Sequence, residues 1–203
     1  MMAVSRLIAD YQMQRYGSQF DGVAIGAPAF RQAFQQVLHL FSGVVENTNG
    51  YDPSPCELEK INNDTIAACD PLDGRTDGVI SRTDLCKLNE HWYPLFLSSF
   101  SQRRSMNAAP VPAANGTVTS QAVALANDIN GGLHDSQGRR VCTSFQPGSG
   151  YPDAATTYNT TTGQYQAVAS GIGVQYVNLF LKDVNSASLS LDNVTYDTPA
   201  SGS

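Results

Sequence analysis

The segment from residue 69 to residue 80 constrains the fold of this chain more than any other stretch; it reads Cys-Asp-Pro-Leu-Asp-Gly-Arg-Thr-Asp-Gly-Val-Ile. Asp70, Asp73 and Asp77 lie within eight positions, and Gly74 and Gly78 permit tight turns between them. Folding the carboxylates to within about 4–5 Å of one another costs roughly 3–4 kcal/mol per pair at an effective dielectric of about 20. A Ca²⁺ ion takes about six to eight oxygen ligands, and its positive charge would offset this repulsion. We therefore expect a calcium-binding loop. The alternative is an acidic surface turn of Asx type, since Asp and Gly dominate turns.

The four cysteines, Cys56, Cys69, Cys86 and Cys142, allow three fully paired disulfide patterns. Cys56 and Cys69 flank a predicted helix, which would hold them about 20 Å apart, beyond the reach of a disulfide. A bond between Cys69 and Cys86 would instead close the acidic loop and stabilise the fold by about 3 kcal/mol. Cys56 and Cys142 then pair with each other or with cysteines outside this chain. No two cysteines have the close spacing of a zinc knuckle, so we do not expect a zinc site.

Composition and charge restrict the partners of the chain. Its 203 residues include 12 basic and 18 acidic side chains, which give a formal net charge of −6. This acidic, charge-poor composition argues against nucleic acid or an anionic membrane as the partner. No apolar run approaches the roughly 18 residues that a membrane-spanning helix needs.

Four Asn-x-Ser/Thr sequons indicate a secreted protein, because such sites mark exposed loops in secreted chains. Residues 1–10 contain no sustained apolar segment of the kind found in a secretory signal. We therefore expect a fragment of a longer secreted chain, the alternative being a cytosolic protein with coincidental sequons. The candidate glycosylation sites are Asn63, Asn115, Asn159 and Asn193.

Apolar periodicity predicts one α/β unit followed by several helices. A stripe of apolar residues from Val4 to Tyr11 marks an amphipathic helix, and the run at 23–25 suits a strand buried on both faces of a parallel sheet. Helix followed by buried strand is the repeating unit of an α/β fold, and only one such unit occurs. Further helices are predicted at 34–45, from a capping box at Ser54 to Ala68, at 121–129 and at 174–181.

Two of these stretches resemble the fungal tannase and feruloyl esterase family. The first is Phe20–Ala29, which reads Phe-Asp-Gly-Val-Ala-Ile-Gly-Ala-Pro-Ala, and the second is the motif Cys-Asp-x-Leu-Asp-Gly-x-x-Asp-Gly that begins at Cys69. The similarity continues over residues 55–89, 121–133 and 191–198. The resemblance implies a secreted serine esterase with an α/β-hydrolase core and a large inserted lid.

For this chain the resemblance implies an α/β fold class with two parts. Residues 1–29 would be a remnant of the α/β-hydrolase core, with one helix and one strand, and residues 30–203 would be a mixed, mainly helical lid domain. The lid would hold Ca²⁺ in the loop at 69–86, which a Cys69–Cys86 disulfide closes. The implied calcium ligands are the side chains of Asp70, Asp73 and Asp77 and the carbonyl oxygens of Arg75 and Val79.

The family's catalytic residues are not expected in this chain. The nucleophile of the family sits in a Cys-Ser-x-Gly-Gly turn before the first helix, where this sequence reads Met-Ala-Val-Ser-Arg. Ser5 is therefore a poor nucleophile, since the strained turn needs small residues. The family's Asp and His follow the lid, beyond residue 203. We expect His39, His91 and His134 to be structural or solvated, because no nucleophile and orienting acid accompany them.

The sequence thus predicts a carboxylic ester hydrolase of the tannase or feruloyl esterase type, acting on aromatic-acid esters through a serine acyl-enzyme. This chain would be a fragment that carries the calcium-binding lid and is inactive by itself. The alternatives are a non-catalytic secreted calcium-binding module and an inactive truncated gene product. A disulfide partner chain or a processing partner is a further possibility: Arg103-Arg104 is either a cleavage site within the lid or two solvated arginines.

Overall fold

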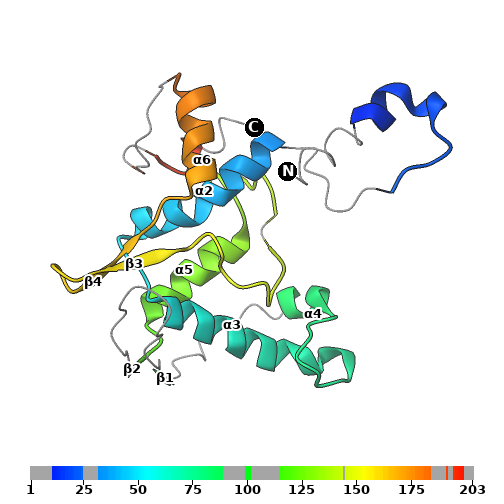
Figure 1. Ribbon diagram of the computed structural model, residues 1–203. Coiled ribbons are helices and arrows are strands. Elements are labelled where there is room, and N and C mark those ends of the chain that lie inside the picture. The colour runs from blue at the N-terminus through cyan, green and yellow to red at the C-terminus, as the bar shows by residue number, and fades with distance from the viewer. Residues whose placement is uncertain are drawn as a thin grey trace.

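The computed structural model describes residues 11–24, 32–88, 99–101, 115–143, 145–183, 191 and 194–198. Within these ranges the chain is mainly helical, and two short antiparallel pairs of strands accompany the helices (Figure 1). The longer elements are α2 (Gln32–Asn49), α3 (Pro55–Cys69), α5 (Ser120–Gly131) and the hairpin of β3 (Thr156–Asn159) with β4 (Gln164–Ala167). The shorter ones are η1 (Gly17–Gln19), η2 (Asp70–Asp73), α4 (Thr83–Leu88), β1 (Ser99–Ser101), β2 (Asn115–Thr117), α6 (Gly171–Tyr176) and the π-helical turn η4 (Val177–Leu181).

Helices α6, α2, α5 and α3 follow one another in that order through the body of the molecule (Figure 1). Helix α2 is buried on two sides. On one side Val37, Phe41 and Val45 pack against residues of α3 and α5, including Ile61 and Leu125, to form the larger core. On its other side lies a smaller core formed by Leu40, Val44, Val174, Val177 and Val194.

Helix α3 begins where the sequence predicts. The Oγ of Ser54 accepts the backbone N–H of Glu57 at 3.3 Å, and Oε2 of Glu57 accepts the backbone N–H of Ser54 at 3.3 Å. Pro55 occupies the first helical position, where its missing N–H costs nothing. The predicted capping box is therefore confirmed, and it fixes the direction of the helix that leads into the acidic loop.

The predicted buried strand at 23–25 is wrong for its described part. Residues 22–24 form no strand, the side chain of Val23 is 46% exposed, and Ile25 lies outside the described residues. A strand needs neighbouring strands for its backbone groups, and the described residues contain two separate two-stranded antiparallel sheets with no parallel pairing. The preceding helix is present at 11–16 and stands apart from the body in Figure 1. Residues 4–10 of the predicted helix lie outside the described part.

Within the described residues, no helix is both long enough and apolar enough to cross a bilayer.

Candidate functional site

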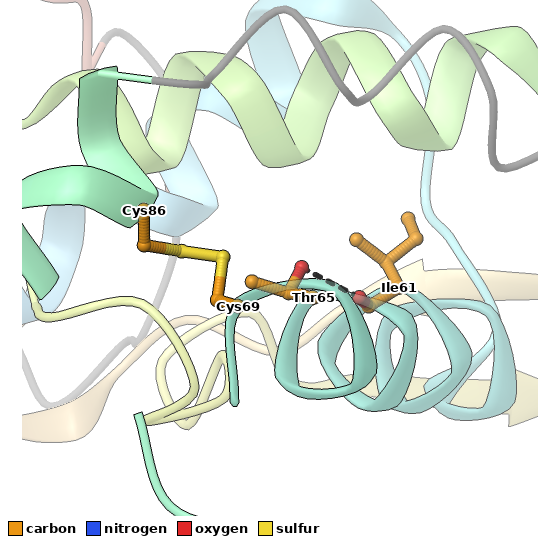
Figure 2. The surroundings of a disulfide bond; sticks show 4 residues. All are labelled: Ile61, Thr65, Cys69 and Cys86. Atoms are coloured by element: carbon orange, nitrogen blue, oxygen red, sulfur yellow. Dashed lines mark hydrogen bonds between the residues drawn. A yellow bond between two sulfur atoms is a disulfide. The ribbon is translucent and has the colours of Figure 1, made fainter. Parts of the chain in front are cut away.

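The acidic loop is joined to the end of α3 and to α4 by a disulfide. Cys69 and Cys86 are bonded, as expected, with their Cα atoms 5.4 Å apart, and both side chains are buried. Figure 2 shows the bond joining the last turn of α3 to α4. In the preceding turns of α3, the hydroxyl of Thr65 donates to the carbonyl of Ile61 at 2.8 Å. The disulfide thus fixes both ends of the loop in the body of the protein.

Asp70 closes the loop from within. Its side chain is only 4% exposed, and each carboxylate oxygen accepts one backbone N–H from the far side of the loop. Oδ1 accepts the N–H of Asp77 at 3.2 Å, and Oδ2 accepts that of Gly78 at 3.0 Å. A carboxylate that accepts two amides is strongly held, so Asp70 sets the shape of the turn.

Asp73 and Asp77 each form a local turn of the Asx type. Oδ1 of Asp73 accepts the N–H of Arg75 at 2.8 Å, and Oδ1 of Asp77 accepts the N–H of Val79 at 3.1 Å. The residue after each acid, Gly74 (φ +88°) and Gly78 (φ +82°), has a left-handed backbone, which favours glycine at both positions. These bonds use one oxygen of each carboxylate and leave Oδ2 for another ligand.

The fit of this loop to Ca²⁺ rests on its donor chemistry. Carboxylate and carbonyl oxygens are the ligands that Ca²⁺ prefers, and the expected set contains nothing else. The fourth acid of the 69–86 segment, Asp84, is paired with Arg82 at 2.8 Å, and this bond holds the pKa of Asp84 at about 2. Among the described residues no three His, Cys, Asp or Glu side chains converge closely enough to hold a metal ion. The loop therefore contains the oxygen ligands that Ca²⁺ prefers, but its carboxylates would have to move closer together to bind one ion.

The described histidines have structural partners. Nδ1 of His39 lies 3.0 Å from both carboxylate oxygens of Asp153, which ties α2 to the loop before β3. Nδ1 of His134 lies 2.8 Å from the carbonyl of Gly132, and its ring stacks on Tyr196 with the centroids 5.0 Å apart. Within the described part of the chain, neither histidine shares a hydrogen bond with a serine, as a catalytic base would.

The remaining residues that the sequence singles out lie partly inside and partly outside the described part of the chain. Asn63 is exposed on α3, and Asn159 is half-buried at the end of β3, where its amide donates to Oε1 of Gln166 at 3.2 Å. Cys56 is a buried thiol that forms no disulfide with Cys142. Asn115 begins β2. Ser5, His91, Arg103, Arg104 and Asn193 lie outside the described residues.

The sequence predicts only one role for Glu57, its part in the capping box of α3. The structure adds that Oε1 of Glu57 accepts the N–H of Thr119 at 3.1 Å, and that the hydroxyl of Tyr51 donates to the same carboxylate at 2.9–3.0 Å. The Oγ of Thr119 donates to Tyr51 and accepts the N–H of Ala122, capping α5. Burial, with the nearby Glu57, raises the pKa of Tyr51 to about 12. One buried carboxylate therefore joins the first turns of α3 and α5.

Comparisons with known proteins match most of the chain to one family. The sequence model of the family described as tannase and feruloyl esterase matches residues 9–201. A tannase from Aspergillus oryzae is 48% identical over 92% of this chain and 36% of its own length. The solved structure of a tannin acyl hydrolase from Aspergillus niger is 48% identical with a TM-score of 0.86 over 94% of this chain and 34% of that one.

A more distant structure shares the fold. Feruloyl esterase B from Aspergillus oryzae is 19% identical and superposes with a TM-score of 0.64 over 94% of this chain. The chain thus spans about a third of the length of the relatives that it matches.

Proposed function

Because the chain belongs to the tannase and feruloyl esterase family, we propose that it forms the lid part of a secreted carboxylic ester hydrolase that acts on esters of aromatic acids such as gallic or ferulic acid. The observation that carries this proposal is the 48% identity to a tannase over 92% of the chain. In the whole enzyme a serine attacks the ester carbonyl, a histidine takes its proton, and water then hydrolyses the acyl-enzyme.

The residues of this chain would cover and shape the site rather than perform the chemistry. His39 is held by Asp153, and His134 is stacked on Tyr196, so neither carries the arrangement of a general base beside a nucleophile. The expected contribution of the lid is to exclude water and to shape the pocket for the aromatic acid. We therefore expect the isolated chain to have no esterase activity.

A direct assay tests this expectation. The purified chain is incubated with methyl gallate and methyl ferulate, and release of the free acid is followed by chromatography. No turnover above the buffer rate is expected. Turnover of methyl gallate that is lost on Ser5→Ala would place the nucleophile in this chain and overturn the assignment.

The loop at 69–86 is proposed to bind Ca²⁺ through the side chains of Asp70, Asp73 and Asp77 and the carbonyls of Arg75 and Val79. Three features support it: the disulfide that fixes its ends, the glycine turns between the acids, and an all-oxygen donor set. The ion would supply charge neutralisation and cross-linking of the loop. It is not needed to polarise a substrate in the serine mechanism.

Calcium binding is tested by thermal unfolding with Ca²⁺ and with EGTA. A ligand at about 100 times its Kd stabilises the folded state by about 2.7 kcal/mol, so Tm should rise in Ca²⁺. The double variant Asp73→Asn/Asp77→Asn should lose that rise. Asp183→Asn, an exposed acid outside the loop whose left-handed backbone (φ +51°) asparagine also tolerates, is the matched control and should keep it. Superimposable melts in Ca²⁺ and EGTA would rule the site out.

Secretion of the whole protein is proposed from the sequons and the disulfide. Asn63 is an exposed helical position, so its side chain is accessible to a glycan. Expression through a yeast secretory pathway followed by glycosidase treatment should reveal a mass loss, and Asn63→Gln should reduce it by one glycan. A mass that the glycosidase leaves unchanged would argue against glycosylation.

A further inference from the structure

A polar pocket of about 440 Å³ lies beside the end of α2, away from the acidic loop. It is lined by residues from the end of α2, the link to α3, β4 and the chain after β4. Figure 1 shows the end of α2 beside the hairpin of β3 and β4. Its lining residues are Glu46, Asn47, Gly50, Asp52, Gln166, Ala167, Ala169 and Leu191. Two of them are acids, and none of these described lining residues is basic.

Glu46 is the unusual member of this lining. Its side chain is fully buried, and neither carboxylate oxygen has a hydrogen-bond partner within the described part of the chain. A buried polar group without a partner costs about 1–3 kcal/mol, and a charged one costs more. Such an arrangement is stable only if the acid is protonated or a cation neutralises it.

Asp52 adds a second carboxyl group to the same pocket. Its half-buried carboxylate interacts with the backbone N–H of Ala167 in β4. Burial, and after it the charge of Asp52, raise the pKa of Glu46 to about 8. Glu46 and Asp52 are the titratable side chains among the lining residues, so the field in the pocket favours a positive ligand.

We propose that this pocket binds a guanidinium group between Glu46 and Asp52. A guanidinium offers five N–H donors in a plane, enough to serve several carboxylate oxygens at once, whereas an ammonium offers three. Guanidinium is also weakly hydrated, which suits a pocket that Ala167, Ala169 and Leu191 partly line.

The proposal makes a specific prediction about pH. Glu46 would be about 1% ionised at pH 6 and about 90% ionised at pH 9 if its pKa is about 8. A cation binds the ionised form, so affinity should rise at least tenfold from pH 6 to pH 9. This prediction is independent of the calcium loop and of esterase activity, and its failure would leave the proposed function untouched.

The experiment is a titration of the ¹⁵N-labelled chain with methylguanidinium chloride, followed by amide chemical shifts at pH 6 and pH 9. We expect saturable shifts centred on Gly50, Ala167 and Ala169, and binding at least tenfold weaker in Glu46→Gln. The exposed Glu59 on α3 provides the matched control, and Glu59→Gln should bind normally. Asp52→Asn, at a half-buried position, gives a second test in case the buried substitution impairs folding.

Two further arms fix the chemistry of the ligand. Methylammonium chloride should bind at least threefold more weakly, and sodium chloride at equal ionic strength should cause no saturable shifts. N-acetylarginine amide binds as well as methylguanidinium if the pocket accepts an arginine side chain, and more weakly if it accepts small free guanidinium compounds; either result supports the proposal. Absence of saturable shifts at pH 9, equal binding of methylammonium, or unchanged affinity in Glu46→Gln would overturn it.

Discussion

Replacing Glu57 with glutamine tests whether one buried carboxylate holds α3 and α5 together. The side chain is 5% exposed and accepts hydrogen bonds from Tyr51, Ser54 and Thr119. Glutamine keeps the shape, but it removes the charge and turns one acceptor atom into a donor that faces another donor. Net hydrogen bonds to charged groups contribute about 1.5–3 kcal/mol each, so losing one and weakening the others should cost about 2–4 kcal/mol.

Urea unfolding followed by circular dichroism measures that cost. Glu59→Gln, on the exposed side of the same helix, is the matched control and should change stability by less than about 0.5 kcal/mol. Tyr51→Phe removes one donor and should cost about 1–1.5 kcal/mol. Because Tyr51 and Glu57 are bonded, the double variant should be less destabilised than the sum of the two single variants.

Amide hydrogen exchange distinguishes a link between α3 and α5 from a role of Glu57 that is confined to α3. Glu57 holds the backbone of Thr119, which in turn caps α5 at Ala122, so amide exchange at the start of α5 should accelerate in Glu57→Gln. Faster exchange confined to α3, or a stability within about 0.5 kcal/mol of the parent chain, would refute the role assigned to this carboxylate.

Three other changes have outcomes that follow from the structure. At Gly173 an added Cβ would lie 2.9 Å from a backbone oxygen of α2, so Gly173→Ala should destabilise by about 1–3 kcal/mol in urea unfolding, whereas Gly131→Ala, with nothing within 4 Å, should be neutral or stabilising. Replacing Cys69 and Cys86 together by alanine should cost about 3 kcal/mol, because the bond closes a loop of 17 residues. Between pH 4.5 and about 8 the unfolded chain releases the proton of Glu46 while the folded chain keeps it, so stability should fall by up to about 1.4 kcal/mol per pH unit, and Glu46→Gln should flatten this slope.

The sequence predicted well those features that depend on near neighbours. The capping box at Ser54 and Glu57 and the apolar stripe of α2 involve residues three or four positions apart, and both formed as expected. The prediction of a buried strand that includes Val23 was wrong, because a strand needs hydrogen-bonding partners from other segments of a sheet. A short apolar run between glycines indicates that a segment could form a strand. It does not indicate whether neighbouring strands are present to pair with it.

The polar features that the sequence missed are those made by long-range packing. Glu57 and Thr119 are 62 positions apart, and no local pattern pairs them. Glu46 is buried in α2, and nothing in the sequence around it distinguishes it from an exposed glutamate. Its pocket also needs residues of β4, which lie far away in the sequence. In the acidic loop the residue types predicted the turns correctly, but the use of both oxygens of Asp70 for backbone amides depends on a closed loop that sequence spacing does not specify.

Helix α3 explains how the acidic loop can be held in place before any ion is considered. Its 15 residues span about 22 Å, and each end is fixed by a different kind of bond. At the start, the carboxylate of Glu57 joins α3 to α5, and at the end the disulfide of Cys69 joins it to α4. Because both ends are fixed and Ile61 is buried between them, α3 can neither rotate about its axis nor slide along it without breaking one of these contacts. An ion in the loop would therefore order the segment beyond Asp70 and leave the position of the helix unchanged.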